Sequence, residues 1–237
     1  MLLDKKTILI TGAASGLGEA LTEQCASAGA GLILLDKNRR GLIDLSDRMT
    51  GQGMSSPGLY PLDLASAGID EFNELVATIR SEYGGLYALI HCAVDFEGLQ
   101  PLDQIEPQQW LKSIQVNLNA PWLLSCACLP MLKQSEQGRL FFLLDDPERV
   151  KEAYWGPYGT AKCALSGLVA QFAATLSNTS VMVRGIEPGT MRTAFRAKAY
   201  HADNPLEQPE PAIAAAKILR LLSEDISESD SIIRLAE

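Results

Sequence analysis

Short apolar runs alternate with amphipathic stretches along almost the whole chain, and this alternation restricts the fold more than any other feature. Parallel strands need long crossover connections, which are usually helices, so the pattern predicts an α/β fold with a parallel sheet. Central parallel strands are apolar on both faces. The runs that we expect to be strands are Thr7–Thr11, Leu32–Asp36, Gly58–Leu62, Leu86–Cys92, Arg139–Leu144 and Val181–Ile186, with Ser231–Leu235 as a possible last strand.

The stretches between these runs carry apolar residues three and four positions apart, which predicts crossover helices. The expected helices are Gly18–Ala28, Arg39–Thr50, Ile69–Tyr83, Gln108–Lys133, Tyr158–Leu176 and Pro211–Leu222. Only the stretch 190–208 is long and irregular, and we expect it to be a lid over a cleft. Since no linker or repeat divides the chain, residues 1–237 are expected to form a single domain.

The composition limits the class of partner. A formal net charge of -9 opposes binding to nucleic acid or to anionic membranes, and the charged N-terminus precedes an apolar run too short for a signal peptide. The five cysteines lie in apolar runs without Cys-x-x-Cys spacing, which is typical of reduced thiols and of a cytoplasmic protein. His91 and His201 lack partners at a metal-ligand spacing, so no metal site is expected.

The first apolar run leads into a glycine-rich turn, Thr11-Gly12-Ala13-Ala14-Ser15-Gly16-Leu17-Gly18, after which a helical pattern begins. Glycines let such a turn approach a pyrophosphate, whose charge the N–H groups of the helix N-terminus then meet. Glycine-rich connections without a ligand also occur. The strand before the turn and the helix after it favour a dinucleotide site.

Asp36 ends the second run, eighteen residues after Gly18, where a carboxylate can accept hydrogen bonds from an adenosine ribose. The same carboxylate would repel a ribose 2′-phosphate, which favours NAD. Lys37 and Arg39 stand beside it and leave NADP possible, and Asp36 alternatively is a solvated strand end. Asp63, after the third run, is either an acceptor for the adenine amino group or a helix N-cap.

Tyr158 and Lys162 stand four residues apart, hence one turn apart on one face of a predicted helix. A free tyrosine titrates near pH ~10, and lowering its pKa to about 7 needs about 4 kcal/mol. One ammonium at about 4 Å and an effective dielectric of ~20 supplies about that much. We therefore expect Lys162 to lower the pKa of Tyr158; an exposed pair without function is the alternative.

Taken together, these motifs resemble those of the short-chain dehydrogenase/reductase family from about Lys5 to Leu235. The matching features, in family order, are the Thr-Gly-x-x-x-Gly-x-Gly turn, Asp63, Val116-Asn117, Tyr158 with Lys162, and Glu187-Pro188-Gly189-Thr190. The resemblance implies a single Rossmann-type, doubly wound parallel sheet with helices on both faces. It also implies a nicotinamide cofactor and hydride transfer between its C4 and a carbonyl or alcohol carbon of a small molecule.

The resemblance also assigns roles to residues. Tyr158 would give or take the hydroxyl proton, Lys162 would bond the nicotinamide ribose, and Asn117 would hold a water of a proton relay. Asn117 is alternatively a buried amide that satisfies the helix. A homodimer or homotetramer is implied by resemblance alone. The implied cofactor-binding residues are Gly12, Ser15, Gly16, Leu17, Gly18, Asp36, Asp63, Leu64, Cys92, Ala93, Tyr158, Lys162, Pro188, Gly189, Thr190 and Thr193.

The chain departs from the family where a serine usually stands thirteen residues before the tyrosine and donates to the substrate oxygen. Here that position is Asp145, followed by Asp146 and Pro147. An ionised carboxylate would oppose an oxyanion, and loss of one such donor costs roughly 10²–10³ in rate. The two acids alternatively cap a turn.

A second departure is Cys92-Ala93-Val94, where the family usually has Asn-Ala-Gly. Val94 places bulk where backbone normally approaches the cofactor, which predicts weaker or shifted binding. The two departures leave two hypotheses open. One is an NAD(P)-dependent oxidoreductase, and the other is a non-catalytic relative that binds a nucleotide or a protein partner.

Overall fold

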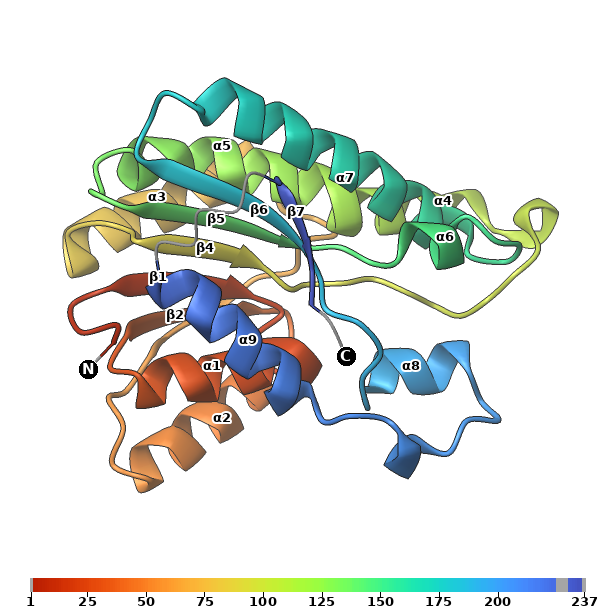
Figure 1. The fold of residues 1–237 in the computed structure, drawn as a ribbon, viewed down its shortest axis with the longest axis horizontal. Coiled ribbons are helices and arrows are strands. Elements are labelled where there is room, and N and C mark those ends of the chain that lie inside the picture. Colours follow the sequence, from red (N-terminus) through yellow and green to blue (C-terminus); the bar gives the residue numbers. More distant parts are fainter. Residues whose placement is uncertain (1, 225–229, 236–237) are drawn as a thin grey trace.

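The computed structural model describes residues 2–224 and 230–235, and its described strands form one parallel sheet. The strand order is β3-β2-β1-β4-β5-β6-β7 (Figure 1). This arrangement confirms the predicted Rossmann-type α/β fold, and each expected strand is present with ends within two residues of those predicted. The strands are β1 (Thr7–Thr11), β2 (Gly31–Asp36), β3 (Gly58–Pro61), β4 (Ala88–His91), β5 (Gly138–Leu143), β6 (Val181–Glu187) and β7 (Ile232–Arg234).

Helices cover both faces of the sheet, with α1, α2 and α9 on one face and α3, α5 and α7 on the other (Figure 1). None of the helices in the described part of the chain combines the length and apolarity needed to cross a membrane. The helices are α1 (Gly16–Ser27), α2 (Arg39–Gly51), α3 (Ile69–Tyr83), α4 (Pro107–Ile114), α5 (Ala120–Leu132), α6 (Pro147–Val150), α7 (Gly156–Leu176), α8 (Ala194–Ala199) and α9 (Pro211–Ser223).

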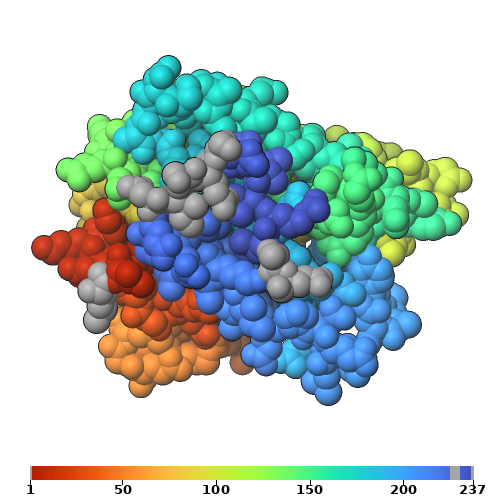
Figure 2. Space-filling model, in the orientation of Figure 1, coloured from red at the N-terminus to blue at the C-terminus, as the bar shows by residue number. Residues whose placement is uncertain are grey.

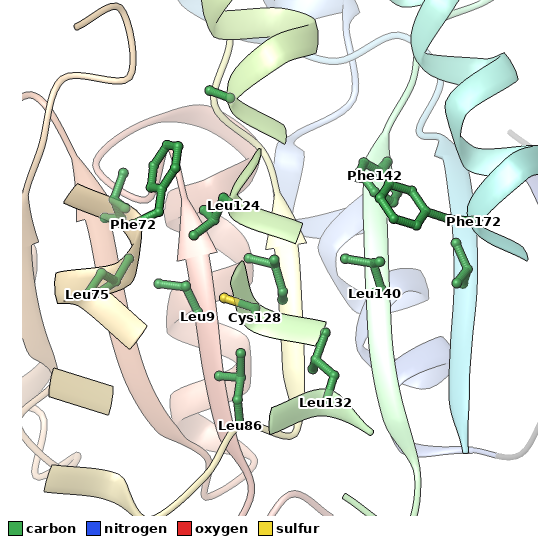
Figure 3. Packing of buried hydrophobic residues seen from close by; sticks show 14 of the residues in the cluster. Leu9, Phe72, Leu75, Leu86, Leu124, Cys128, Leu132, Leu140, Phe142 and Phe172 are labelled. Atoms are coloured by element: carbon green, nitrogen blue, oxygen red, sulfur yellow. The ribbon is translucent and has the colours of Figure 1, made fainter. Parts of the chain in front are cut away.

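The sheet separates two hydrophobic cores because successive strand side chains point to opposite faces. In β1, Leu9 packs into the core beneath α3 and α5, whereas Ile8 and Ile10 pack into the core beneath α1 and α9. Figure 3 shows Leu9 and Phe72 on the first side, together with Phe142. Burial on both faces explains the nearly continuous apolar runs in the sequence.

Two expectations need correction. The predicted helix 108–133 is interrupted by a π-helical turn, Gln115–Asn119, between α4 and α5. The stretch 190–208 is not irregular throughout, since it contains α8 and a 3₁₀ turn at Pro205–Glu207. Thr193 accepts a hydrogen bond from the Arg196 N–H and so caps α8. The sequence pattern did not predict this helix, because α8 is too short to show a helical periodicity.

The sheet reverses its winding between β1 and β4, since β2 follows on one side of β1 and β5 on the other side of β4. In open α/β sheets, ligands bind outside the carboxyl ends of the strands at such a switch point. Thr11, at the end of β1, accepts hydrogen bonds from the N–H groups of Cys92 and Ala93 at 3.2 Å each. The loops after β1 and β4 are therefore fixed against each other.

The central aromatic packing generates a stability prediction. Phe142 is fully buried, with its ring centroid 4.8 Å from that of His91 and 5.9 Å from that of Phe172. Phe142→Ala is expected to lower the free energy of unfolding by about 3–5 kcal/mol, because it removes apolar contacts and leaves a cavity. Urea denaturation measures this change. Ile213→Ala on the exposed side of α9 is the control, and an equal loss in both variants would contradict the packing account.

Candidate active site

A cleft of about 420 Å³ opens at the carboxyl ends of the strands. Its walls come from the loops after β1, β2, β3, β4, β5 and β6, and from α7 and α8. In Figure 2, the α8 segment in light blue and the α6 segment in green lie on the same side of the molecule. The sequence-predicted residues that line the cleft are Gly12, Ser15, Gly16, Leu17, Gly18, Asp36, Asp63, Leu64, Cys92, Ala93, Tyr158, Lys162, Pro188, Gly189, Thr190 and Thr193.

The glycine-rich turn has the backbone that the motif requires. Gly12 and Gly16 have φ values of +65° and +56°, in the left-handed region that favours glycine. A Cβ on Gly18 would lie 2.1 Å from the Gly12 carbonyl oxygen, so only glycine lets α1 start this close to the turn. Ser15 is the N-cap residue and its side chain makes no capping bond. A pyrophosphate therefore fits at the N-terminus of α1.

Asp36 and Asp63 both line the cleft, and both also brace loops. The Asp36 carboxylate accepts hydrogen bonds from the Ala14 N–H at 3.1 Å and from the Asn38 N–H at 2.8 Å. Asp36 therefore joins the glycine-rich turn to the loop after β2 and is not only a solvated strand end. Asp63 accepts from the Ala65 N–H at 3.0 Å and caps a turn rather than a helix. Both carboxylates retain further acceptor capacity.

The segment after β6 and the loop after β4 both lie beside the glycine-rich turn. A Cβ on Gly16 would lie 3.5 Å from the Thr193 methyl carbon, so α8 begins beside the glycine turn. Gly189, with φ of +78°, redirects the chain after β6. Val94 lines the cleft and is 41% exposed, and weaker or shifted cofactor binding because of its bulk stays a prediction.

Asp145 lines the cleft beside Tyr158, which donates a hydrogen bond to its Oδ2 atom at 2.6 Å. Its Oδ1 atom forms an ion pair with Arg149 and accepts from the Asp146 N–H. The sequence allows Asp145 and Asp146 alike to be turn caps. Asp146 alone caps α6, by accepting from the Glu148 N–H at 3.0 Å, whereas Asp145 is held in the cleft.

The prediction that Lys162 lowers the pKa of Tyr158 is wrong for this arrangement. Burial raises the pKa of Tyr158 well above 10, and the charge and hydrogen bond of Asp145 raise it further. The charge that lowers the pKa of Tyr158 is that of Arg149, whereas the Lys162 Nζ atom donates to the Leu143 carbonyl oxygen at 2.6 Å and lies 5.7 Å from the centroid of the Tyr158 ring. The prediction for the pKa of Tyr158 took account of the Lys162 ammonium but not of the Asp145 carboxylate, which accepts a hydrogen bond from the phenol.

Lys162 itself is buried in the cleft wall. Burial lowers the pKa of this ammonium to about 8, with the nearby charge of Asp145 acting in the opposite direction. The group therefore changes charge near pH 8. A lysine with a depressed pKa beside a cleft is a common property of functional sites.

Asn117 lies outside the cleft lining. Its amide nitrogen donates to the Asp95 carbonyl oxygen at 2.8 Å and to the Ser113 carbonyl oxygen at 2.9 Å, and its amide oxygen accepts from the Asp95 N–H. These bonds match the alternative of a buried amide that satisfies the backbone, here at the π-helical turn. The water-holding role stays a prediction.

An aromatic cluster that the sequence did not reveal surrounds the Tyr158 ring. Phe96, Trp155 and Phe195 have ring centroids 5.3, 5.7 and 5.0 Å from that of Tyr158. The Arg149 guanidinium lies 5.3 Å from the Trp155 centroid. Phe96 and Trp155 stand in loops far apart in sequence, so no periodic signal joins them. Arg149 stands four residues after Asp145, but Asp145 precedes α6, so the helical i, i+4 rule does not predict their ion pair.

Fold and cleft together define a Rossmann-type α/β protein with a glycine-rich turn at one end of its cleft, and comparison with known proteins agrees. The family model described as short chain dehydrogenase matches residues 6–204. Uncharacterized oxidoreductase YciK of Escherichia coli K12 is 32% identical over 224 residues, which cover 94% of this chain and 88% of that protein. The chain therefore belongs to the short-chain dehydrogenase family.

Solved structures support the same assignment. A short chain dehydrogenase structure from Salmonella enterica serovar Typhi superposes with a TM-score of 0.93 at 31% identity, covering 99% of this chain and 96% of that one. A structure from Shigella flexneri 2a, complexed with NADP, has a TM-score of 0.93 at 30% identity, covering 98% and 97% of the two chains.

The buried Lys162 generates a pH prediction. Its pKa is about 8 in the folded protein and 10.5 in an unfolded chain, so between these values the unfolded state binds more protons. Stability should therefore rise with pH over this range. Compared with Lys162→Met, the wild type should gain about 2 kcal/mol of unfolding free energy between pH 8 and pH 10. Urea titrations at each pH measure the difference, and a constant difference would refute burial of the ammonium.

Proposed function

We propose that this protein is an NAD(P)-dependent oxidoreductase of the short-chain type, which transfers a hydride between the cofactor and a small molecule. One observation carries the proposal: a single cleft joins the glycine turn at the N-terminus of α1 to Tyr158 and Lys162. A nucleotide-binding relative without catalysis would not need a buried lysine with a lowered pKa at the far end of that cleft.

The chain's own residues divide the work along the cleft. Gly12, Gly16 and the first amides of α1 would hold the pyrophosphate. Lys162 would bond the nicotinamide ribose when it leaves the Leu143 carbonyl, and Pro188 and Thr190 would border the nicotinamide. Bound there, the cofactor would supply or accept a hydride at its C4 atom. Tyr158 and Asp145 would meet the heteroatom of the substrate.

Cofactor preference depends on the end of β2. The Asp36 carboxylate favours the ribose hydroxyls of NAD, while Lys37 lines the same part of the cleft and would attract a 2′-phosphate. Solved relatives are complexed with NADP and with NADPH, so NADP is at least as strong a candidate as NAD. We propose that the protein accepts both cofactors, with opposing contributions from Asp36 and Lys37.

Removing the Asp36 charge tests this division. Asp36→Asn no longer repels a phosphate and keeps one acceptor oxygen, so it retains only one of the two bonds from the Ala14 and Asn38 N–H groups. The ratio of NADPH to NADH affinity should rise by about tenfold, measured by calorimetry on both cofactors. Asp44→Asn, on an exposed ion pair with Arg40, is a matched charge control and should leave the ratio unchanged. An equal ratio in wild type and Asp36→Asn would contradict the assignment.

Replacing Lys162 tests the oxidoreductase proposal. Lys162→Met should slow NAD(P)H consumption with any accepted carbonyl or imine compound by about 10²-fold, because it removes the charged donor beside the reacting end. Stopped-flow absorbance of the reduced cofactor measures the rate. Lys151→Met, which removes an exposed ammonium outside the cleft, is the control. Binding of cofactor without hydride transfer to any compound of the panel would instead favour the non-catalytic relative.

A further inference from the structure

The chain that leaves β6 for the cleft is held at both of its ends. Its first four residues, 188–191, all line the cleft, and we call them the cleft segment. At the far end of this segment, the Arg192 N–H donates to the Pro209 carbonyl oxygen at 2.8 Å. The Arg192 side chain also forms an ion pair with Glu210, just before α9. The position of the near end depends on how β6 finishes.

The last residue of β6 is held by β7 rather than by β5. The pairing of β5 with β6 ends at Leu143 and Ile186. Glu187 instead pairs with Arg234 of β7, and its carbonyl oxygen accepts from the Leu235 N–H at 3.0 Å. In Figure 1, β7 accordingly lies beside β6, near the chain that leads to α8. The point at which the chain leaves the sheet for the cleft is therefore fixed by β7.

An ion pair between side chains reinforces this backbone contact. The Arg234 Nε atom donates to Oε2 of Glu187 at 2.6 Å. The Glu187 side chain is only 10% exposed, whereas the Arg234 side chain is 68% exposed. A buried carboxylate without its cationic partner is costly, so Glu187 would shift toward solvent if Arg234 were removed. Pro188, the first residue of the cleft segment, would move with it.

Arg234 also acts on the neighbouring connection, which follows β5. The hydrogen bond and the charge of Glu187 raise the pKa of Arg234, and the charges of Asp146 and Glu148 raise it further. Asp146 caps α6, and Asp145 immediately before it lines the cleft. Arg234 thus supplies positive charge to acids from two of the connections that form the cleft.

We propose that Arg234 is a positioning residue for the cofactor, which acts through Glu187 to hold the cleft segment in place for the nicotinamide. The inference rests on the proposed function, in which Pro188 and Thr190 border the nicotinamide. Arg234 and Glu187 are not among the described residues that line the cleft, so their effect is indirect. The adenosine half of the cofactor would be held elsewhere, by Asp36 and the glycine-rich turn. Loss of Arg234 should therefore weaken the binding of one half of the cofactor only.

Two probes that differ in the nicotinamide alone test the proposal. NADH and ADP-ribose share the adenosine, the pyrophosphate and the second ribose, and only NADH carries the dihydronicotinamide. Arg234→Met should lower the affinity for NADH about 5- to 10-fold, measured by calorimetry, and change the affinity for ADP-ribose by less than about twofold. NADPH and 2′-phospho-ADP-ribose form the equivalent pair with the additional phosphate, and the same ratio is measured with them.

Arg220→Met is the matched control for this substitution. Arg220 also pairs through its Nε atom with a glutamate, Glu224, but both side chains are exposed and neither is among the described residues that line the cleft. Its replacement should change neither affinity.

Two further variants separate positioning from a general loss of structure. Arg234→Lys keeps a positive charge beside Glu187 and should recover most of the affinity for NADH. Glu187→Gln combined with Arg234→Met should lose no more than the weaker-binding single variant, because both changes break the same contact. Urea denaturation checks that each variant is folded.

The outcomes separate this inference from the proposed function. A lower ratio of NADH to ADP-ribose affinity in Arg234→Met, with recovery in Arg234→Lys, is the expected result. An equal loss for both probes would reveal a general structural effect and overturn the positioning role, and so would an unchanged ratio. Either result would leave the oxidoreductase function standing, since the wild type still binds its cofactor. Failure of the wild type to bind NADH or NADPH would overturn both.

Discussion

The reversal of winding between β1 and β4 is the constraint on which the rest of the structure depends. Because neighbouring strands are parallel, their carboxyl ends meet at one edge, and the reversal opens a gap between the connections that leave on opposite faces. Thr11 ties the two central loops together across this gap. Residues as distant in sequence as Gly12, Tyr158 and Thr193 therefore line one cleft.

Electrostatics at the far end of the cleft differ from what the family pattern implies. A buried carboxylate stands beside the phenol, and an arginine four residues further along the chain forms an ion pair with it. The desolvated lysine loses part of its affinity for a proton, while the phenol keeps its proton more firmly. The pKa of Tyr158 is thus raised and that of Lys162 lowered, although the family pattern pairs the two residues.

The sequence predicted the features that local pattern controls. Strands buried on both faces are continuous apolar runs, so the sheet followed directly, and the glycine turn was recognisable because steric limits at Gly12 and Gly18 admit no other residue. The π-helical turn at Asn117 depends on bonds to Asp95 across a loop, and the aromatic cluster joins Phe96 to Trp155. Neither has a local signal. The direction of the Tyr158 pKa shift depends on the hydrogen-bond partners of Tyr158 and Lys162. The spacing of the two residues alone does not determine these partners.

The most direct test of the central claim is a crystal structure of the protein with oxidised cofactor bound. The account predicts the pyrophosphate against the first amides of α1 and the nicotinamide ring beside the Tyr158 hydroxyl, with Asp145 still paired to Arg149. A groove that stays empty at saturating cofactor, or a nicotinamide turned away from Tyr158 by the Val94 side chain, would contradict it.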